Sequence, residues 1–143
     1  MAIENFRSWI EHWEQNGWLT RIGKPVDARY VLGGITMKLA KEKAVLFERV
    51  SGCAAPLVTN FLFSREALVA SVGMEAGNLI SWLQEAMEKP RSCTVVDKAP
   101  FQENVLTGEL NILKLFPIPT YHEGDAGPYI TGGVLIAKDP ETG

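Results

Sequence analysis

The first residues of the chain alternate apolar and polar side chains with the period of a helix. Between residues 6 and 13 the apolar side chains recur every three or four positions, and charged ones occupy the opposite side. Asn5 is placed to cap the first turn, and Gly17 is a typical helix stop. The pattern predicts a helix over residues 6–15 and, directly after it, a short strand over 18–22.

A second helical stripe begins at Asp27, an expected N-cap, and continues to about Lys43. Gly33 and Gly34 lie inside this stripe, where each glycine costs about 1 kcal/mol relative to alanine. Close packing against a neighbouring element would explain them. The stripe predicts a helix that is capped by Asp27 and runs to about Lys43, with the two glycines as its weak point.

Two apolar runs, 44–50 and 57–63, have the length and composition of strands. The turn-forming residues 51–56 separate them. This arrangement predicts a hairpin or another adjacent pairing of the two runs.

Two more helices are expected, one over 64–72 capped by Ser64 and one over 78–89 ended by Pro90. In the second helix the residues expected to face inward are Leu79, Leu83, Ala86 and Met87. Beyond Pro90 the pattern changes to short extended pieces at 93–97, 101–106 and 110–113. This change places a domain boundary near Gly108, with one domain at 1–109 and the start of another at 110–143.

The longest strand candidate is 129–138, which alternates along its length and is followed by turn-forming residues at 139–143. A turn after a strand normally brings the chain back to pair with it. The strand would therefore keep an open hydrogen-bonding edge unless another segment covers it. We expect the sequence to be an N-terminal piece of a longer polypeptide.

Composition excludes several classes of protein. The chain has 14 basic and 17 acidic residues and a net charge of −3, with no basic cluster, which argues against nucleic-acid binding. Its apolar stretches are far shorter than the ~20 residues of a spanning helix. Its first residues lack the layout of a signal peptide. Cys53 and Cys93 form no CxxC motif and are expected to be buried, reduced thiols. These features predict a cytoplasmic protein.

Few residues suggest chemistry by themselves. There is no dinucleotide loop, phosphate loop or HExxH motif, and His12 and His122 alone cannot build a zinc site. His12 is expected to lie exposed on the polar side of the first helix. Residues 122–125 could offer a base and two carboxylates, but a solvated turn is the favoured interpretation. For the four tryptophans we favour burial in the core or between domains over a stacking surface; they are Trp9, Trp13, Trp18 and Trp82.

Gly132 and Gly133 lie next to each other inside the last strand candidate. Adjacent glycines leave room for a flat ligand, such as a flavin ring or an aromatic acid, to approach the backbone. Thr131 beside them adds a hydroxyl that can donate or accept a hydrogen bond. A bulge or a tight bend explains the glycines equally well, so the residues alone leave both interpretations open.

Several blocks along the chain match a known family in order. They are GWLTRI at 17–22, PVD at 25–27, AVLFERVSG at 44–52, PLVTN at 56–60, Ser64-Arg65, LFPIP at 115–119, His122, DAGPYITGG at 125–133 and KDPETG at 138–143. With these blocks the sequence resembles the UbiD-type reversible decarboxylases, which use prenylated flavin mononucleotide (FMN).

The resemblance implies an α+β fold: a mixed N-terminal domain followed by the first strands of a split β-barrel that binds the flavin. It implies a carboxy-lyase for an aromatic or α,β-unsaturated carboxylic acid, with Mn²⁺ and a monovalent cation such as K⁺ near the flavin phosphate. A flavin prenyltransferase supplies the cofactor in this family, and the enzymes assemble as homo-oligomers.

In this family the metal-binding Asn and the Glu–Arg–Glu set for proton transfer come after the turn at 139–143. The resemblance therefore assigns no catalytic residue and no metal ligand here. It maps four residues onto the wall beside the flavin, namely Ile130, Thr131, Gly132 and Gly133. We expect the 143-residue chain alone to be inactive and to bind no cofactor. The alternative is a non-catalytic assembly module that pairs with a partner polypeptide through the strands at Trp18 and Tyr129.

Overall fold

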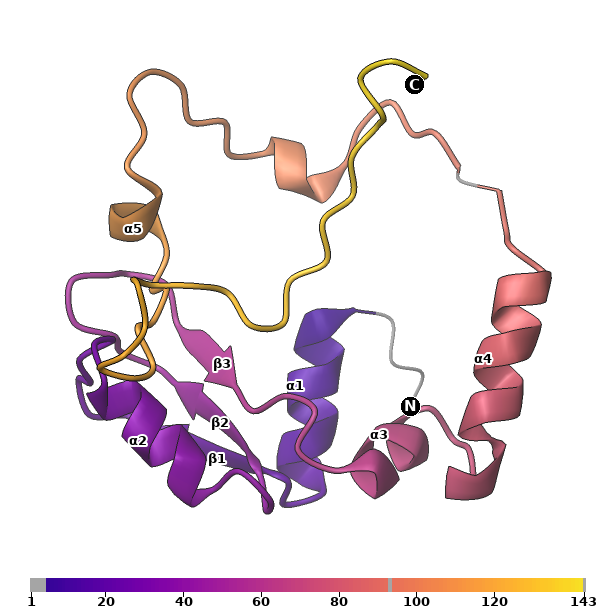
Figure 1. Cartoon of the computed structure of the whole chain (residues 1–143), viewed down its shortest axis with the longest axis horizontal. Helices are drawn as coiled ribbons and strands as arrows, with labels where there is room; N and C mark the ends of the chain where they lie inside the picture. Colours follow the sequence, from indigo (N-terminus) through magenta and orange to yellow (C-terminus); the bar gives the residue numbers. More distant parts are fainter. Residues whose placement is uncertain (1–4, 93, 143) are drawn as a thin grey trace.

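The computed structural model describes residues 5–92 and 94–142 (Figure 1). The elements in chain order are α1 (Phe6–Gln15), β1 (Leu19–Ile22), α2 (Val31–Lys38), β2 (Ala44–Phe47), β3 (Leu57–Thr59), α3 (Arg65–Ser71), the 3₁₀ turn η1 (Ala76–Asn78), α4 (Leu79–Glu88), the 3₁₀ turn η2 (Pro100–Gln102) and α5 (Ile112–Leu115). The structure thus has the mixed α+β composition that the sequence predicts.

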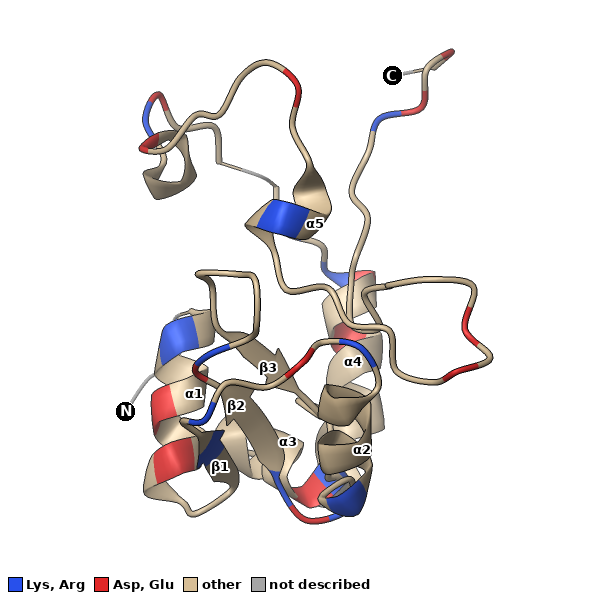
Figure 2. Cartoon of the chain, turned by 90° about the vertical axis from the view of Figure 1, so that its left-hand side faces the viewer, with Lys and Arg blue, Asp and Glu red and all other residues tan. Residues whose placement is uncertain are grey.

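The three strands form one sheet in the order β1-β2-β3. The central strand β2 runs parallel to β1 and antiparallel to β3, which confirms the predicted pairing of the two apolar runs. All four residues of β2 are buried because both of its faces are covered. Figure 2 shows α1 and α2 on opposite sides of the sheet.

The α2 side of the sheet carries the main hydrophobic core. Val45 and Phe47 of β2 are fully buried there, together with Leu32 of α2. Val26 and Val50 complete the cluster, and a parallel bridge joins these two residues. The alternation of β2 therefore places every second side chain against α2.

An aromatic cluster lies on α1. Trp13 is buried, and its ring centroid is 4.1 Å from that of Phe61 and 5.3 Å from that of Phe63. Its indole Nε1 donates a hydrogen bond of 2.9 Å to Ser71 Oγ of α3. These contacts hold α1 against α3 and confirm the core position predicted for Trp13.

The other predictions for side chains of α1 and α4 fare differently. Trp82 of α4 is 47% exposed, so it belongs to no core among the described residues. His12 is only half-buried, edge-on to Trp18 at 6.1 Å, and not fully exposed as predicted. The two rings meet because His12 lies in the last turn of α1 and Trp18 follows shortly after the helix ends.

Two predicted helix caps are present. The Asn5 side chain accepts hydrogen bonds from the amides of Arg7 and Ser8, and the Ser8 hydroxyl reaches back to Asn5. The Ser64 hydroxyl accepts from the amide of Ala67 at the start of α3. Both satisfy amides that a helix start leaves without partners.

The second helix is shorter than predicted. It begins at Val31 rather than Asp27, because the chain from 26 to 29 is used in pairing: Arg29 bridges Thr120, and the Asp27 carboxylate accepts from the amide of Arg29. It ends at Lys38, and the Asn60 side chain then donates to the carbonyls of the turn that follows. Tertiary contacts at both ends therefore override the local helical pattern.

Close packing explains one of the two glycines in this helix. A Cβ at Gly33 would lie 2.7 Å from the carbonyl oxygen of Tyr121, so only glycine fits there. A Cβ at Gly34 would have no described atom within 4 Å. The two neighbours thus differ completely in their surroundings.

The strands predicted in the second half of the chain are not formed. No residue from 94 to 142 belongs to a strand of the sheet, and α5 occupies part of the predicted extended piece 110–113; position 93 lies outside the described residues. Val134, Leu135 and Ile136 are 88–93% exposed. Alternation alone does not make a strand, which needs a neighbour to satisfy its backbone. In Figure 1 the last, yellow part of the chain is an unpaired connection that leads away from the sheet.

The inward face predicted for α4 is also absent among the described residues. Leu83 and Met87 are exposed, and no residue of α4 is buried.

The predicted turn after residue 138 is present, with the Asp139 carboxylate accepting from the amides of Glu141 and Thr142. Cys53 is half-buried as a free thiol, while Cys93 lies outside the described residues.

Candidate functional site

The four residues predicted to contact the cofactor, Ile130 to Gly133, are exposed and contiguous. Thr131 and Gly132 form a turn, which corrects the predicted continuous strand and the division of its side chains between two faces.

The surroundings of this segment suit a flat ligand. Gly132 is exposed, and a Cβ at this position would meet no described atom within 4 Å. Ile130 is 69% exposed, and its Cγ2 would lie 3.4 Å from a Cβ at Gly133. Exposed backbone, an apolar side chain and the Thr131 hydroxyl are groups on which a ring with polar edges can lie. They form one wall and not an enclosed pocket.

Three hollows that the structure describes lie elsewhere. One of about 800 Å³ runs along α4 beside Trp82 and Arg91, and a second of about 500 Å³ lies at the start of the same helix. Another of about 450 Å³ surrounds η2. None of these three is lined by the candidate segment.

The chain just before the segment is anchored to the N-terminal domain. Thr120 donates from its amide to the carbonyl of Ala28 at 3.2 Å and accepts from the amide of Tyr30 at 2.8 Å. Pro117 and Pro119 are buried beside it. The bridge places residue 120 next to the start of α2.

The polar loop 121–129 then leads to the segment. One carboxylate oxygen of Asp125, Oδ2, accepts from the amides of Tyr121 at 3.1 Å and His122 at 2.8 Å. The amide of Tyr129 donates to the carbonyl of Pro119 at 3.0 Å, which closes the loop at its base. His122 and Glu123 are exposed. The geometry agrees with the favoured interpretation of this loop as a turn.

Two tyrosines pack together inside the loop. The rings of Tyr121 and Tyr129 meet edge to face with centroids 5.4 Å apart. Partial burial and the adjacent negative charge of Asp125 raise the pKa of the Tyr129 hydroxyl. Tyr129 therefore keeps its proton to a higher pH than a free tyrosine.

No cluster of three or more His, Cys, Asp or Glu side chains that could hold a metal ion occurs among residues 5–92 and 94–142. In the same part of the chain no helix is long and apolar enough to cross a bilayer.

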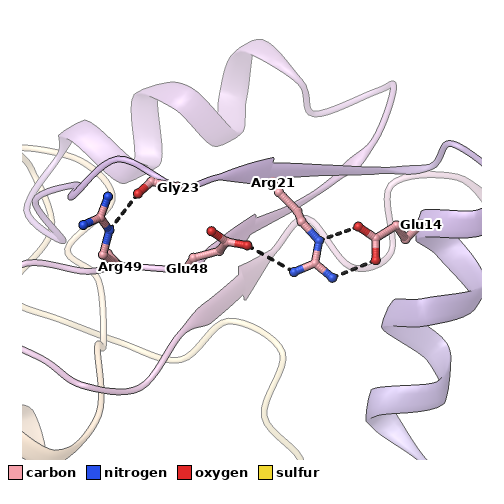
Figure 3. A network of polar contacts seen from close by, with 5 residues as sticks. All are labelled: Glu14, Arg21, Gly23, Glu48 and Arg49. Carbon is pink, nitrogen blue, oxygen red and sulfur yellow. Dashed lines mark hydrogen bonds and ion pairs between the residues drawn. The ribbon is translucent and has the colours of Figure 1, made fainter.

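A surface ion cluster was not predicted from the sequence (Figure 3). The Arg21 guanidinium binds both carboxylate oxygens of Glu14, and its Nη1 lies 3.2 Å from Glu48 Oε1. The hydrogen bond from Arg21, reinforced by its charge, lowers the pKa of Glu14. The two carboxylates raise the pKa of Arg21. The cluster links α1 to β1 and to the end of β2.

Only the register of the sheet could have revealed this cluster. Arg21 is paired with Leu46, and Glu48 is two residues further along the chain from Leu46. The Glu48 side chain therefore projects on the same face of the sheet as that of Arg21. The parallel pairing on which this depends is not evident from local sequence.

Two family models match the chain in order. The N-terminal domain of 3-octaprenyl-4-hydroxybenzoate carboxy-lyase matches residues 10–87, and the Rift-related domain of the same family matches residues 94–143.

Known proteins match nearly the whole chain. It is 38% identical to an uncharacterized protein in the cooM 5′ region of Rhodospirillum rubrum, over 94% of this chain and 30% of that protein. The UbiD-class enzyme HmfF of Pelotomaculum thermopropionicum in complex with prFMN is also 38% identical, over 96% of this chain and 33% of the enzyme, with a TM-score of 0.89.

A second solved structure is vanillic acid decarboxylase of Sedimentibacter hydroxybenzoicus in closed form. It is 26% identical over 91% of this chain and 30% of that chain, with a TM-score of 0.79. The chain thus spans about a third of the length of these relatives.

Proposed function

Because the chain belongs to the UbiD family, we propose that it is the N-terminal region of a carboxy-lyase. The enzyme would release carbon dioxide reversibly from an aromatic or α,β-unsaturated carboxylic acid with prenylated FMN as cofactor. The observation that carries the proposal is the match to HmfF, which extends over 96% of this chain with a TM-score of 0.89. The matched HmfF structure is a complex with prFMN.

In this proposal the residues Ile130 to Gly133 lie against the flavin. The bound cofactor supplies the electron sink that holds the electron pair left when the carboxyl carbon departs. The chain contributes the exposed backbone at Gly132 and the apolar contact of Ile130. The described residues bring together no group of three or more His, Cys, Asp or Glu side chains, so we propose that the ligands of the Mn²⁺ expected for the family, and those of its K⁺, come from elsewhere in the polypeptide.

The test uses the protein expressed from its complete reading frame together with a flavin prenyltransferase. The purified protein is incubated with a panel of aromatic and unsaturated acids, and carbon dioxide release is measured. The control is the same protein produced without the prenyltransferase. We expect release only from the protein that carries the prenylated cofactor. No release with any acid, despite a bound prenylated flavin, would contradict the proposal.

We also propose that the 143-residue chain by itself does not catalyse this reaction. It offers one exposed wall to the cofactor and no assigned acid–base residue. Supplying the chain with prenylated FMN and Mn²⁺ should therefore give no carbon dioxide above the protein-free control. Release above that control would place acid–base residues within these 143 positions.

One observation favours the alternative of a non-catalytic assembly module. β1 is an edge strand of the sheet, and Val134 to Ile136, in the unpaired stretch predicted as a strand, are exposed. Both could add to a sheet of a partner. This alternative predicts that the product of the complete reading frame binds no flavin, whereas the enzyme hypothesis predicts a stoichiometric flavin absorbance.

A further inference from the structure

The loop between Thr120 and Ile130 is organised around one carboxylate. Asp125 Oδ2 accepts from two successive amides, those of Tyr121 and His122, and the amide of Asp125 donates to the carbonyl of His122 at 3.1 Å. A carboxylate forms stronger hydrogen bonds with amides than a neutral acceptor does. The start of the loop is therefore held by the side chain near its middle.

The same loop is fixed to the N-terminal domain through Tyr121. The carbonyl of Tyr121 lies against Gly33 of α2, at a distance that leaves no room for a Cβ. The Tyr121 side chain packs against the hydrophobic core that contains Leu32. Asp125 thus binds the amide of Tyr121, the residue that contacts α2, and the amide of His122, the next residue.

The loop ends at the candidate segment. The Tyr129 ring packs edge to face on Tyr121, and the Tyr129 amide is bound to Pro119. Tyr129 is directly followed by Ile130. A displacement of Tyr121 would therefore be transmitted through Tyr129 to the backbone that Gly132 exposes.

We propose that Asp125 is a positioning residue that fixes the 121–129 loop on α2 and thereby sets where Ile130 to Gly133 face the flavin. This inference rests on the proposed function, since it gives the loop a role toward the same cofactor. Asp125 is not assigned any contact with the cofactor itself.

The first measurement is flavin binding by the product of the complete reading frame, titrated with FMN and followed by flavin fluorescence. The variants are Asp125→Ala, Asp125→Asn and, as a matched control in the same loop, Glu123→Gln. Removing the acceptor should weaken FMN binding about tenfold in Asp125→Ala, whereas Asp125→Asn keeps an acceptor oxygen and should retain most of the affinity. Glu123→Gln should bind as the wild type does, because Glu123 is exposed and accepts neither of the two amide hydrogen bonds.

The second measurement is amide hydrogen exchange of the same variants without flavin. In Asp125→Ala the amides of Tyr121 and His122 and the peptide containing 129–133 should exchange faster, while the peptide containing β2 should not change. Urea unfolding followed by tryptophan fluorescence should have the same midpoint in all variants. These readouts separate a positioning role from a loss of folding.

The outcomes also separate the two proposals. If the wild type binds no FMN, the cofactor assignment fails, and hydrogen exchange then decides the role of Asp125 alone. If Asp125→Ala binds FMN like the wild type, or its exchange at 129–133 is unchanged, the positioning role is wrong. If Asp125→Ala loses FMN binding and its urea unfolding midpoint falls as well, Asp125 supports the fold as a whole rather than the position of the loop. That result would also overturn the inference.

Discussion

A buried hydrogen bond joins α1 to α3. Trp13 Nε1 donates to Ser71 Oγ, and both residues are buried. The substitution Ser71→Ala leaves the indole N–H of Trp13 buried without this acceptor. It should therefore lower the free energy of unfolding by about 1–3 kcal/mol. Urea unfolding followed by tryptophan fluorescence measures the change. Ser81→Ala on the exposed surface of α4 is the control and should shift it by less than about 0.5 kcal/mol; equal effects of the two variants would contradict the prediction.

The ion cluster at Arg21 should make stability depend on pH in the acidic range. The hydrogen bond and charge of Arg21 lower the pKa of Glu14 below its ordinary value of 4.5 in the folded state. The contribution of Glu14 is therefore fully present above pH 4.5 and is lost as the pH falls through the lowered folded-state pKa, because the unfolded state then binds the proton more readily.

The matching variants are Glu14→Gln and, as control, Glu11→Gln on the exposed surface of the same helix. The difference in unfolding free energy between wild type and Glu14→Gln should shrink as the pH is lowered from 6 toward 3. Glu11→Gln should track the wild type throughout. Because the cluster is partly exposed, added salt should also reduce the Glu14 difference. A difference independent of pH would rule out this ionic contribution.

Single residues were predictable where their effect is local. Asn5 and Ser64 were recognised as caps because a short polar side chain before an apolar stripe can bind only the next few amides. Glu14 and Glu48 were not recognised as partners of Arg21. Their contact depends on the helix position and on the parallel register, which place residues distant in sequence on one face.

Among the elements, α1 and α3 form as predicted, because each buries its apolar side against a neighbour within the first 71 residues. The runs 44–50 and 57–63 pair as predicted, but β2 and β3 occupy only Ala44–Phe47 and Leu57–Thr59 of them. The α2 prediction is too long, since residues before Val31 pair with distant backbone instead. The predicted strand at 129–138 has the correct alternation but no neighbour among the described residues. Periodicity predicts which side chains could be buried and leaves the pairing partner undetermined.

The two glycines of α2 allow a matched test of how that helix is packed. Gly33→Ala places a Cβ 2.7 Å from the Tyr121 carbonyl oxygen and should lower the free energy of unfolding by about 1–3 kcal/mol, because the loop must move away. Gly34→Ala meets open space in the same helix and should raise it by about 0.5–1 kcal/mol through reduced backbone entropy. Thermal and urea unfolding of both variants measure the difference. Equal signs for the two would contradict the close contact of α2 with Tyr121.

For the molecule as a whole, the family resemblance identified the fold and the candidate segment more specifically than periodicity did. The residues Ile130 to Gly133 are contiguous, so a motif could indicate them. The contacts that fix their position, from Asp125 to the Tyr121 amide and from Tyr121 to Gly33, join residues up to 88 positions apart. Such contacts follow from the packed fold and not from any local pattern.

Burial divides the described chain into two unlike parts. Every buried residue of the hydrophobic core lies between Trp13 and Val69, whereas the chain from 94 to 111 is almost entirely exposed and has little backbone pairing. Brief trypsin treatment of the 143-residue chain should therefore cut first after Arg91 or Lys98, because a protease needs an accessible, locally open segment. Mass spectrometry should detect N-terminal products ending at these residues.

Two trypsin sites beside β2 serve as internal controls in that digestion. Arg21 lies in β1, and Arg49, two residues after the end of β2, accepts a backbone hydrogen bond from the amide of Val26, so the bonds after them open only when the sheet unfolds. First cuts at either would show that the sheet is less stable than the segment at 91–98.

In the product of the complete reading frame, the proposed enzyme needs its further polypeptide to cover the exposed apolar side chains of 95–116. Cleavage after Arg91 and Lys98 should then slow relative to the 143-residue chain, and equal rates would indicate that this surface remains uncovered.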